Sequence, residues 1–546
     1  MRFMSPILPG LLLLSVGQAS AQAPSKAFDA LLAPHFAADR PGASVCVMKD
    51  GKVIYAKGFG LASRELKVPN RPGLAYRIAS VTKQFTAAAV LALVEDGKVG
   101  LDAPIGTYLK ELPEAWRAVT VRQLLNHTGG IPNYTEELSY RARMREDLPG
   151  LKLLQAHVWT KPLDFAPGSQ WHYSNSGYYL LGLLIEQVSG TPYGSFLEAR
   201  FFTPLGLTRT TYGTETAFVP GLATGYGEGG QPASYLSLNQ AFAAGALVST
   251  AEDLARWTHA LHGGKVVNAE SLRLMTCPTR TSDGKEHPYG FGLGFRTLAG
   301  HRLIGHNGGI NGFSSAVEAD PEGHTVAVLL FNEEQPEVGA EYLSRRLLAL
   351  AAGVPVLDPK PVVLPASKLA RLAGTYQHAE GYRRTLALTP TGLTSQVGGG
   401  RPYRLTPLSE DTFRMDGQDI HLRFKLKGDD VVGLHRVGLG EPEGSLAPKI
   451  PDVVRKAIKV SPAAMDAVAG TYELAPGMEI KVWRDGERLL AQLTGQSPDE
   501  LLAESESRFF IQAEDTQFEF PRDAEGRCPE LQLNAGGRRM TGKRVK

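Results

Sequence analysis

Apolar and polar residues follow three patterns in the first part of the chain. Residues 43–48 and 53–59 are strand-like segments rich in Val, Ile and Tyr, and the turn sequence Lys-Asp-Gly-Lys separates them. Residues 84–94 are rich in Ala, Leu and Val and lack Gly and Pro, which is typical of a buried helix. Residues 301–331 form consecutive apolar segments broken by Gly-rich and Pro-Glu-Gly turns. We therefore expect an α/β region with an antiparallel sheet flanked by helices and a mostly helical insertion between about residues 85 and 240.

The pattern changes after a Pro-rich linker at residues 353–365. Beyond it, short segments alternate apolar and polar residues, as in Ile-His-Leu-Arg-Phe-Lys-Leu at 420–426. The sequence Leu372-Ala-Gly-Thr-Tyr376 recurs as Val468-Ala-Gly-Thr-Tyr472, an offset of 470 − 374 = 96 residues between the two glycines. The repeat predicts two small antiparallel β-barrels, at residues 366–445 and 463–546. They either pack on the first domain and shape its cleft, or send a loop into it.

The N-terminus has the pattern of a secretion signal. Arg2 precedes an apolar run from Ile7 to Val16, and the small residues of Ala19-Ser-Ala-Gln-Ala23 follow. The run is too short to span a bilayer, and no cysteine near the expected cleavage site could carry a lipid. We expect residues 1–23 to be removed on export, leaving residues 24–355 as the first domain of a periplasmic or secreted protein without a membrane anchor.

The charge, the cysteines and the absence of several known motifs argue against a number of functional classes. The 546 residues carry a formal net charge of +2 and a basic run only in the tail 537–546, so nucleic acid is not an expected partner. The three cysteines, Cys46, Cys277 and Cys528, lack metal-ligand spacing and cannot all pair. The sequences His-Glu-x-x-His and Gly-x-Ser-x-Gly and a phosphate-binding Gly-rich loop are absent. We expect no cofactor and no metal, and a small-molecule or peptide substrate as the partner.

The most informative stretch is Ser80-Val-Thr-Lys83, directly before the predicted helix. Ser80 opens the helix at the positive end of its dipole, and Lys83 follows one turn further on the same face. If burial depresses the pKa of the lysine, its amine can take the serine proton, which makes an acyl-enzyme nucleophile without a histidine triad. Ser-x-x-Lys also occurs by chance, as in the turn-like Ser282-Asp-Gly-Lys285, so further motifs must decide.

A second stretch supplies groups that fit this chemistry. A Pro-Gly turn leads to Tyr173-Ser-Asn175, and an apolar helix follows. Residues two apart in an extended segment point to the same side, so Tyr173 would accept or relay a proton near the serine and Asn175 would hold a substrate carbonyl. The alternative is that Tyr173 packs in the core and Asn175 caps the next helix.

A third stretch is His306-Asn-Gly308-Gly309, at the end of a predicted strand. Because Gly308 and Gly309 have no side chains, a substrate can approach their backbone closely. His127-Thr-Gly also matches His-x-Gly, but it ends a helix-like run at a Gly-Gly stop, so we interpret His127 as structural. His306 is the better candidate for a substrate-binding residue.

In this order, Ser80-x-x-Lys83, Tyr173-x-Asn175 and His306-x-Gly308 resemble the serine β-lactamase and penicillin-binding superfamily. The resemblance is to its class C β-lactamase-like branch of serine hydrolases, which includes carboxylesterases, D-aminopeptidases and DD-peptidases. That branch has the β-lactamase/transpeptidase-like fold, and some of its peptidases carry one or two lipocalin-like barrels behind the catalytic domain.

The resemblance implies a role for each motif residue. Ser80 would be the nucleophile, Lys83 and Tyr173 its proton-transfer partners, and Asn175 the residue that orients the acyl side chain. The backbone N–H groups of Ser80 and Gly309 would form the oxyanion hole, where one donor is commonly worth about 3 kcal/mol. Whether Lys83 or Tyr173 is the base is left open by the sequence.

His306 stands where β-lactamases of this branch carry the lysine of Lys-Thr-Gly. Histidine is shorter and only partly charged near neutral pH. The resemblance therefore favours a serine amidase or peptidase for small, non-standard peptides, such as D-amino-acid or linearised cyclic peptides. A carboxylesterase of the same fold is the alternative, because both use one acyl-enzyme route. A β-lactamase or DD-carboxypeptidase fits less well, and the complete motif set argues against a non-catalytic binding protein.

Overall fold

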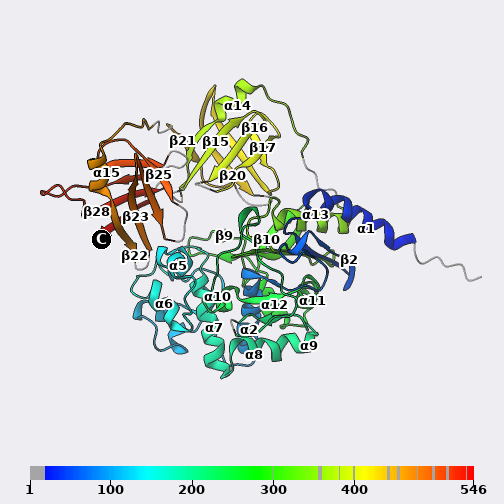
Figure 1. Ribbon diagram of the computed structural model, residues 1–546. Helices are drawn as coiled ribbons and strands as arrows, with labels where there is room; N and C mark the ends of the chain where they lie inside the picture. Colours follow the sequence, from blue (N-terminus) through cyan, green and yellow to red (C-terminus); the bar gives the residue numbers. More distant parts are fainter. Residues whose placement is uncertain are drawn as a thin grey trace, which may run out of the picture.

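The computed structural model describes residues 19–546 except 215, 299, 355–358, 380–381, 398–399, 439–442, 452–454, 476–477, 495–497, 512–515 and 536–537 (Figure 1). A sheet with helices on both faces forms the first part of the chain, and two closed barrels follow it. The predicted α/β region with an antiparallel sheet and two C-terminal barrels is therefore confirmed.

The central sheet joins the two ends of the first domain. Its strand order is β10-β11-β12-β13-β1-β2, and all neighbours are antiparallel, with Val45 opposite Leu329 where β1 meets β13. Because β1 lies in the interior, both of its faces are buried, which explains its continuous apolar run. The strands are β1 Ala43–Lys49, β2 Lys52–Phe59, β10 Gly294–Leu298, β11 His301–Ile310, β12 Phe313–Asp320 and β13 Thr325–Phe331.

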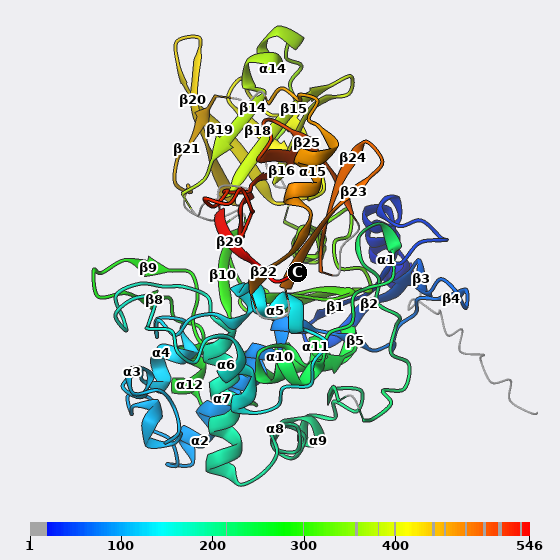
Figure 2. The same cartoon turned by 60° about the vertical axis from the view of Figure 1, so that its left-hand side comes forward.

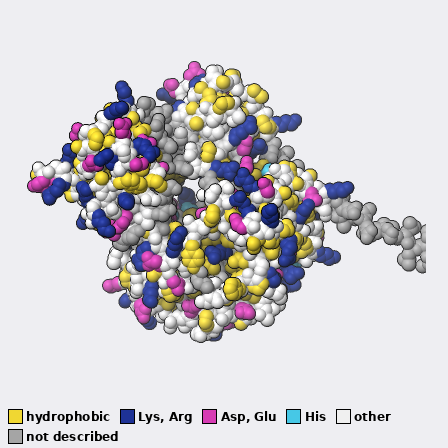
Figure 3. Space-filling view, in the orientation of Figure 1, with side chains coloured by type: hydrophobic (Ala, Val, Ile, Leu, Met, Phe, Trp, Pro, Cys, Tyr) yellow, Lys and Arg dark blue, Asp and Glu magenta, His cyan; other side chains and the backbone are white. Residues whose placement is uncertain are grey.

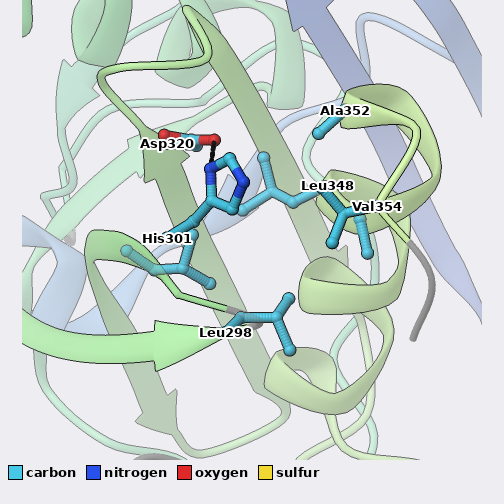
Figure 4. A pocket seen from close by; sticks show the side chains of 8 residues that line it. Leu298, His301, Asp320, Leu348, Ala352 and Val354 are labelled. Atoms are coloured by element: carbon cyan, nitrogen blue, oxygen red, sulfur yellow. Dashed lines mark hydrogen bonds and ion pairs between the residues drawn. The ribbon is translucent and has the colours of Figure 1, made fainter. Parts of the chain in front are cut away.

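The two faces of the sheet belong to two separate hydrophobic cores. Along β1, Val45 and Val47 enter the core under α1 (Ala19–Leu32) and α13 (Ala340–Ala352), whereas Cys46 enters the core shared with the helical part. This alternation is the side-chain period of a strand. Figure 4 shows a small pocket where α13 meets β11 and β12, with a lining that includes Leu298, Leu348 and Val354. The His301–Asp320 pair also lines it, and the Nδ1 and Oδ2 atoms of the pair lie 2.9 Å apart.

The helical part packs on the inner face around α2 (Thr82–Glu95), which is buried over nearly its whole length. The Phe85 ring stacks on Trp257 with centroids 3.9 Å apart, and the Trp257 indole N–H donates to Gln84 Oε1 at 2.9 Å. The other helices are α3 Glu114–Arg117, α4 Val121–Leu125, α5 Leu138–Arg143, α6 Leu151–His157, α7 Asn175–Ser189, α8 Tyr193–Leu197, α9 Thr203–Leu205, α10 Leu238–Gly245, α11 Ala251–His262 and α12 Ala269–Met275.

Each barrel closes through eight antiparallel strands. The first barrel has β14 Gly374–Gln377, β15 Arg383–Thr389, β16 Gly392–Val397, β17 Tyr403–Pro407, β18 Thr412–Met415, β19 Ile420–Lys427, β20 Asp430–Gly438 and β21 Ala447–Ile450. The second has β22 Gly470–Ala475, β23 Met478–Asp485, β24 Arg488–Leu493, β25 Asp499–Ala503, β26 Arg508–Ile511, β27 Thr516–Glu519, β28 Glu530–Ala535 and β29 Arg538–Arg544.

The sequence repeat corresponds to the same arrangement of a short helix, a first strand and a buried tyrosine in both barrels. A short helix, α14 (Ala366–Leu372) or α15 (Pro462–Val468), leads into the first strand of each barrel. The hydroxyl of buried Tyr376 donates to the Leu372 carbonyl at 2.6 Å, and the hydroxyl of buried Tyr472 donates to the Val468 carbonyl at 2.9 Å. Each tyrosine therefore satisfies a carbonyl at the end of its helix. The first barrel extends beyond the predicted end at 445, because β21 closes it against β14.

Both barrels lie on the first domain (Figures 1 and 2). The first barrel contacts α13 through Asp419, and β23 of the second barrel contacts α5 of the helical part. On the face in Figure 3, acidic and basic side chains are interspersed.

The N-terminal signal falls mostly outside the described residues. Its apolar run, Ile7–Val16, precedes Ala19, and α1 begins inside the expected cleavage segment. In the part of the chain that the structure describes, the helices are too short or too polar to cross a bilayer.

Candidate active site

Ser80 lies in a tight turn where the sheet meets the helical part. The turn is the 3₁₀ segment Ala79–Val81, called η2, and α2 continues from Thr82, so Ser80 precedes the α-helix rather than lying in it. Ala79 has a φ of +49°, in the left-handed region that costs a non-glycine residue about 1–3 kcal/mol. Ser80 remains half-exposed, so its hydroxyl is accessible at the end of a rigid support.

Lys83 is buried beside Ser80 with three hydrogen-bond partners. Its Nζ atom lies 3.1 Å from Ser80 Oγ, 2.8 Å from Asn175 Oδ1 and 2.7 Å from the Ala244 carbonyl oxygen. None of these partners is charged, and burial lowers the pKa of Lys83 well below its usual range. A neutral amine has two hydrogens for the amide and carbonyl oxygens. Its lone pair then faces the Ser80 hydroxyl, which is the arrangement of a general base.

Tyr173 lies on the other side of Ser80. Its hydroxyl donates to Ser80 Oγ at 2.9 Å. Burial raises the pKa of Tyr173 well above its ordinary value, so the side chain is a neutral phenol. A neutral phenol gives a proton more readily than it takes one. The structure therefore favours Lys83 as the base and Tyr173 as the acid.

Replacing Tyr173 by phenylalanine is expected to lower kcat/KM for an amide by about a hundredfold or more, the usual worth of a positioned acid. An activated ester should lose much less, because its leaving group departs as an anion without needing a proton. The matched control is Tyr193→Phe, since Tyr193 is a buried tyrosine of the same domain that bonds Thr86 instead of the serine. Equal losses for ester and amide would remove Tyr173 from leaving-group protonation.

Asn175 is held in place by hydrogen bonds from both the nitrogen and the oxygen of its side-chain amide. It is the first residue of α7, and its Nδ2 donates to Thr135 Oγ1 at 3.0 Å while its Oδ1 accepts from Lys83. Its backbone N–H donates to Asn133 Oδ1 at 3.1 Å. The amide thus orients the base. Its contact with the acyl side chain of a substrate stays a prediction.

His306 lies in the middle of β11, not at the end of a strand as the sequence suggested. Its Nδ1–H donates to the Asn307 carbonyl at 2.5 Å, so Nε2 accepts from the Tyr289 hydroxyl at 2.9 Å. Burial lowers the pKa of His306 to about 3. The imidazole is therefore neutral, and it offers no cation to a substrate carboxylate.

Sequence reasoning missed Tyr289, which orients His306. A signal for it is present in the alternating glycines that follow, Gly290 and Gly292. A Cβ on Gly292 would lie 2.6 Å from the Lys83 carbonyl oxygen. These glycines let the segment pass close to α2, and they place Tyr289 in the site.

Gly308 and Gly309 occupy the part of β11 that packs against η2. A Cβ on Gly308 would lie 2.4 Å from the Ile78 carbonyl oxygen and 2.5 Å from Ser315 Oγ, whereas a Cβ on Gly309 would meet nothing within 4 Å. Gly308 thus allows β11 to pack closely against η2, the turn that carries Ser80, and Gly309 borders open space. This placement is compatible with the predicted oxyanion hole, which stays a prediction.

A pocket of about 320 Å³ adjoins Tyr173, and we call it the aromatic pocket. It is lined by Trp171, Tyr173, His287, Pro288, Tyr289, Gly294, Phe295, Arg296, Gly305, His306 and Asn307. Among the described residues, no group of three His, Cys, Asp or Glu side chains is placed to bind a metal.

The two weaker motif matches differ in their position: His127 packs against Tyr173, with ring centroids 4.4 Å apart, whereas Ser282 and Lys285 lie on the surface. His127 is buried, and its Nδ1 accepts from the Ser174 backbone N–H at 3.1 Å, which fits a structural role. Ser282 and Lys285 are exposed in the turn between β8 (Thr279–Arg280) and β9 (Glu286–His287).

Known proteins resemble this chain over both its first domain and its second barrel. The Beta-lactamase family matches residues 26–352, and a domain of unknown function, DUF3471, matches residues 454–544. A D-aminopeptidase of Gluconobacter oxydans is 27% identical over 361 residues, which are 65% of this chain and 65% of that enzyme's length. Penicillin-binding protein 4* of Bacillus subtilis is 25% identical over 414 residues, 71% of this chain and 90% of its own length.

A solved structure agrees with these relatives. The D-amino acid amidase from Ochrobactrum anthropi SV3, in complex with D-phenylalanine, is similar with a TM-score of 0.52 and 26% identity, over 61% of this chain and 99% of its own. The Beta-lactamase match covers more than half of the chain and includes all the motif residues. The chain therefore belongs to the Beta-lactamase family, and it carries the site of a serine hydrolase.

Proposed function

We propose that the protein is an exported serine hydrolase that cleaves amide bonds of small peptides containing D-amino acids or other non-standard residues. The observation that carries this proposal is the hydrogen-bonded row Lys83–Ser80–Tyr173, with a neutral amine on one side of the nucleophile and a neutral phenol on the other. An amide needs both groups, because its amine leaving group must be protonated as it departs.

Acylation follows from this geometry. Ser80 Oγ attacks the substrate carbonyl carbon while Lys83 takes the hydroxyl proton, and the backbone N–H groups of Ser80 and Gly309 would stabilise the oxyanion. The tetrahedral intermediate then collapses. The C–N bond breaks, the nitrogen takes a proton from Tyr173, and the Lys83 ammonium returns a proton to the phenolate. Water repeats the sequence at the acyl-Ser80 ester and releases the acid.

Two observations favour an amidase for D-amino acid substrates over a β-lactamase. Two of the similar proteins are a D-aminopeptidase and a D-amino acid amidase. His306 is neutral, so the site lacks the permanent cation that suits the carboxylate of a β-lactam, and a β-lactamase or DD-carboxypeptidase is the weaker alternative. A carboxylesterase remains the closest alternative, because the same three groups serve an ester.

The discriminating experiment is kcat/KM on one matched panel, with Ser80→Ala as the blank. The panel contains a short-chain ester, D- and L-amino acid amides and a chromogenic cephalosporin. Turnover of D-amino acid amides within about a hundredfold of the ester would support the amidase, since it requires a proton positioned for an amine. Turnover of the ester alone would replace the proposal by a carboxylesterase.

Export is tested separately. We expect the protein from cell fractionation to be periplasmic or secreted and to begin after residue 23, as the signal pattern of the sequence predicts. An intact N-terminus on a cytoplasmic protein would contradict export.

A further inference from the structure

A row of ion pairs connects the first barrel with the wall of the aromatic pocket. Asp419, in the turn between β18 and β19, accepts from two arginines of α13: Arg345 Nη1 lies 2.6 Å from its Oδ2, and Arg346 Nη1 lies 3.0 Å from its Oδ1. Arg345 Nε lies 3.6 Å from Oε1 of Glu318 on β12. The same Glu318 oxygen accepts from Arg296 Nη1 at 3.1 Å, and Arg296 lines the aromatic pocket. The barrel and the pocket thus share one electrostatic network.

The members of this row are largely removed from water. The exposed fractions of the side chains are 9% for Asp419, 6% for Arg345, 1% for Glu318 and 16% for Arg296. The turn is also fixed against the start of α13, since the Gly339 N–H donates to the Gly417 carbonyl at 2.9 Å. Removing one partner of a buried ion pair leaves the other charge uncompensated, so the remaining groups must rearrange.

The row has unused hydrogen-bonding capacity at its centre. Arg345 Nε and Glu318 Oε2 are both buried, and neither has a hydrogen-bond partner among the residues that the structure describes. If Arg345 lost Asp419, Glu318 would be the nearest carboxylate of the row, and its free oxygen could accept from Arg345. Glu318, which already lies 3.6 Å from Arg345, would then bind that arginine more closely, and its hydrogen bond to Arg296 would weaken.

The aromatic pocket is placed to receive the leaving group of a substrate. Tyr173, which hands its proton to that group, forms part of the wall, whereas Asn175, on the predicted acyl side, does not. A released Arg296 side chain would enter this space, because it already lines it.

We propose that Asp419 is a positioning residue for the aromatic pocket: by binding Arg345 it keeps Glu318 available to Arg296, which stays against the sheet and leaves the pocket open. The first barrel is then a functional part of the active site rather than an appended module. This inference rests on the proposed function only in assuming that a substrate leaving group occupies the pocket.

The test compares two amides with the same acyl group in the full-length protein. One releases ammonia, and the other releases an arylamine large enough to enter the pocket. Asp419→Asn is expected to raise KM about tenfold for the arylamide, within the usual range for coupled sites, while kcat and the KM of the small amide change little. Asp419→Glu should restore most of the affinity. In an Arg296→Ala background, Asp419→Asn should have no further effect.

Asp416→Asn is the matched control. It is the same change in the same turn, but Asp416 accepts from Thr406 and pairs with Arg404 and Arg414, which all belong to the same barrel. If Asp419→Asn does not fold, Arg345→Lys breaks the same link, because an ammonium cannot bridge two carboxylates as a guanidinium does.

Equal KM changes for both amides, an unchanged KM, or a full effect in the Arg296→Ala background would overturn the proposal. If the wild type cleaves only esters, the amidase proposal fails. The role of Asp419 is then tested by the same comparison with two esters that differ in the size of their alcohol.

Discussion

Replacing Lys83 by methionine is expected to lower kcat/KM for an amide about a thousandfold or more, within the range for a positioned general base. Methionine fills a similar volume, so α2 should stay packed, but no group remains to take the Ser80 proton. The expected loss of kcat/KM follows from the loss of the buried amine, whose three hydrogen-bond partners hold it beside Ser80 Oγ.

The matched control is Lys285→Met, the same substitution in the exposed second Ser-x-x-Lys segment, which should leave turnover unchanged. The pH profile is a second readout. Because the pKa of Lys83 is lowered, the wild type should remain active at neutral pH and lose activity toward acid as Lys83 takes up a proton. Near-wild-type turnover by Lys83→Met would remove Lys83 from the mechanism.

Gly308→Ala is expected to damage both stability and activity. The new methyl group would lie 2.4 Å from the Ile78 carbonyl oxygen and 3.0 Å from the Ala79 Cβ, so β11 or the nucleophile turn must move. Overpacking of this kind costs about 1–3 kcal/mol of unfolding free energy. A displacement of about 1 Å between the reacting groups can lower kcat/KM about a hundredfold.

Thermal unfolding and kcat/KM on the same preparation test this expectation. Gly309→Ala is the control for stability alone, because its Cβ meets nothing within 4 Å and its melting temperature should match the wild type. If Gly308→Ala were as stable and active as the wild type, the close packing of strand and turn would not be needed for the site.

The candidate catalytic residues could be singled out from the sequence because their signals are local. Ser80 and Lys83 are one helical turn apart, and Tyr173 and Asn175 share one short segment, so the sequence places each pair without knowledge of the fold. Their assembly depends on contacts that no local pattern encodes. Lys83 bonds a carbonyl 161 residues away, and Arg345 meets Asp419 across a domain boundary.

For the fold, too, elements with a strong local sequence pattern could be predicted, and an element without one could not. The period of two residues predicted the barrels, and the burial of β1 on both faces agreed with its continuous apolar run. The strand that closes the first barrel, β21, escaped prediction because it is four residues long and contains Pro448, which weakens a strand signal.

The central claim is that Ser80 forms a covalent acyl intermediate with Lys83 as its base. Its most direct test is to treat the protein with a serine-reactive phosphonate and to locate the added mass by peptide mapping. The account predicts one adduct on Ser80 in the wild type, none in Ser80→Ala and a much slower reaction in Lys83→Met. Equal labelling of the wild type and Ser80→Ala, or an adduct on another residue, would contradict it.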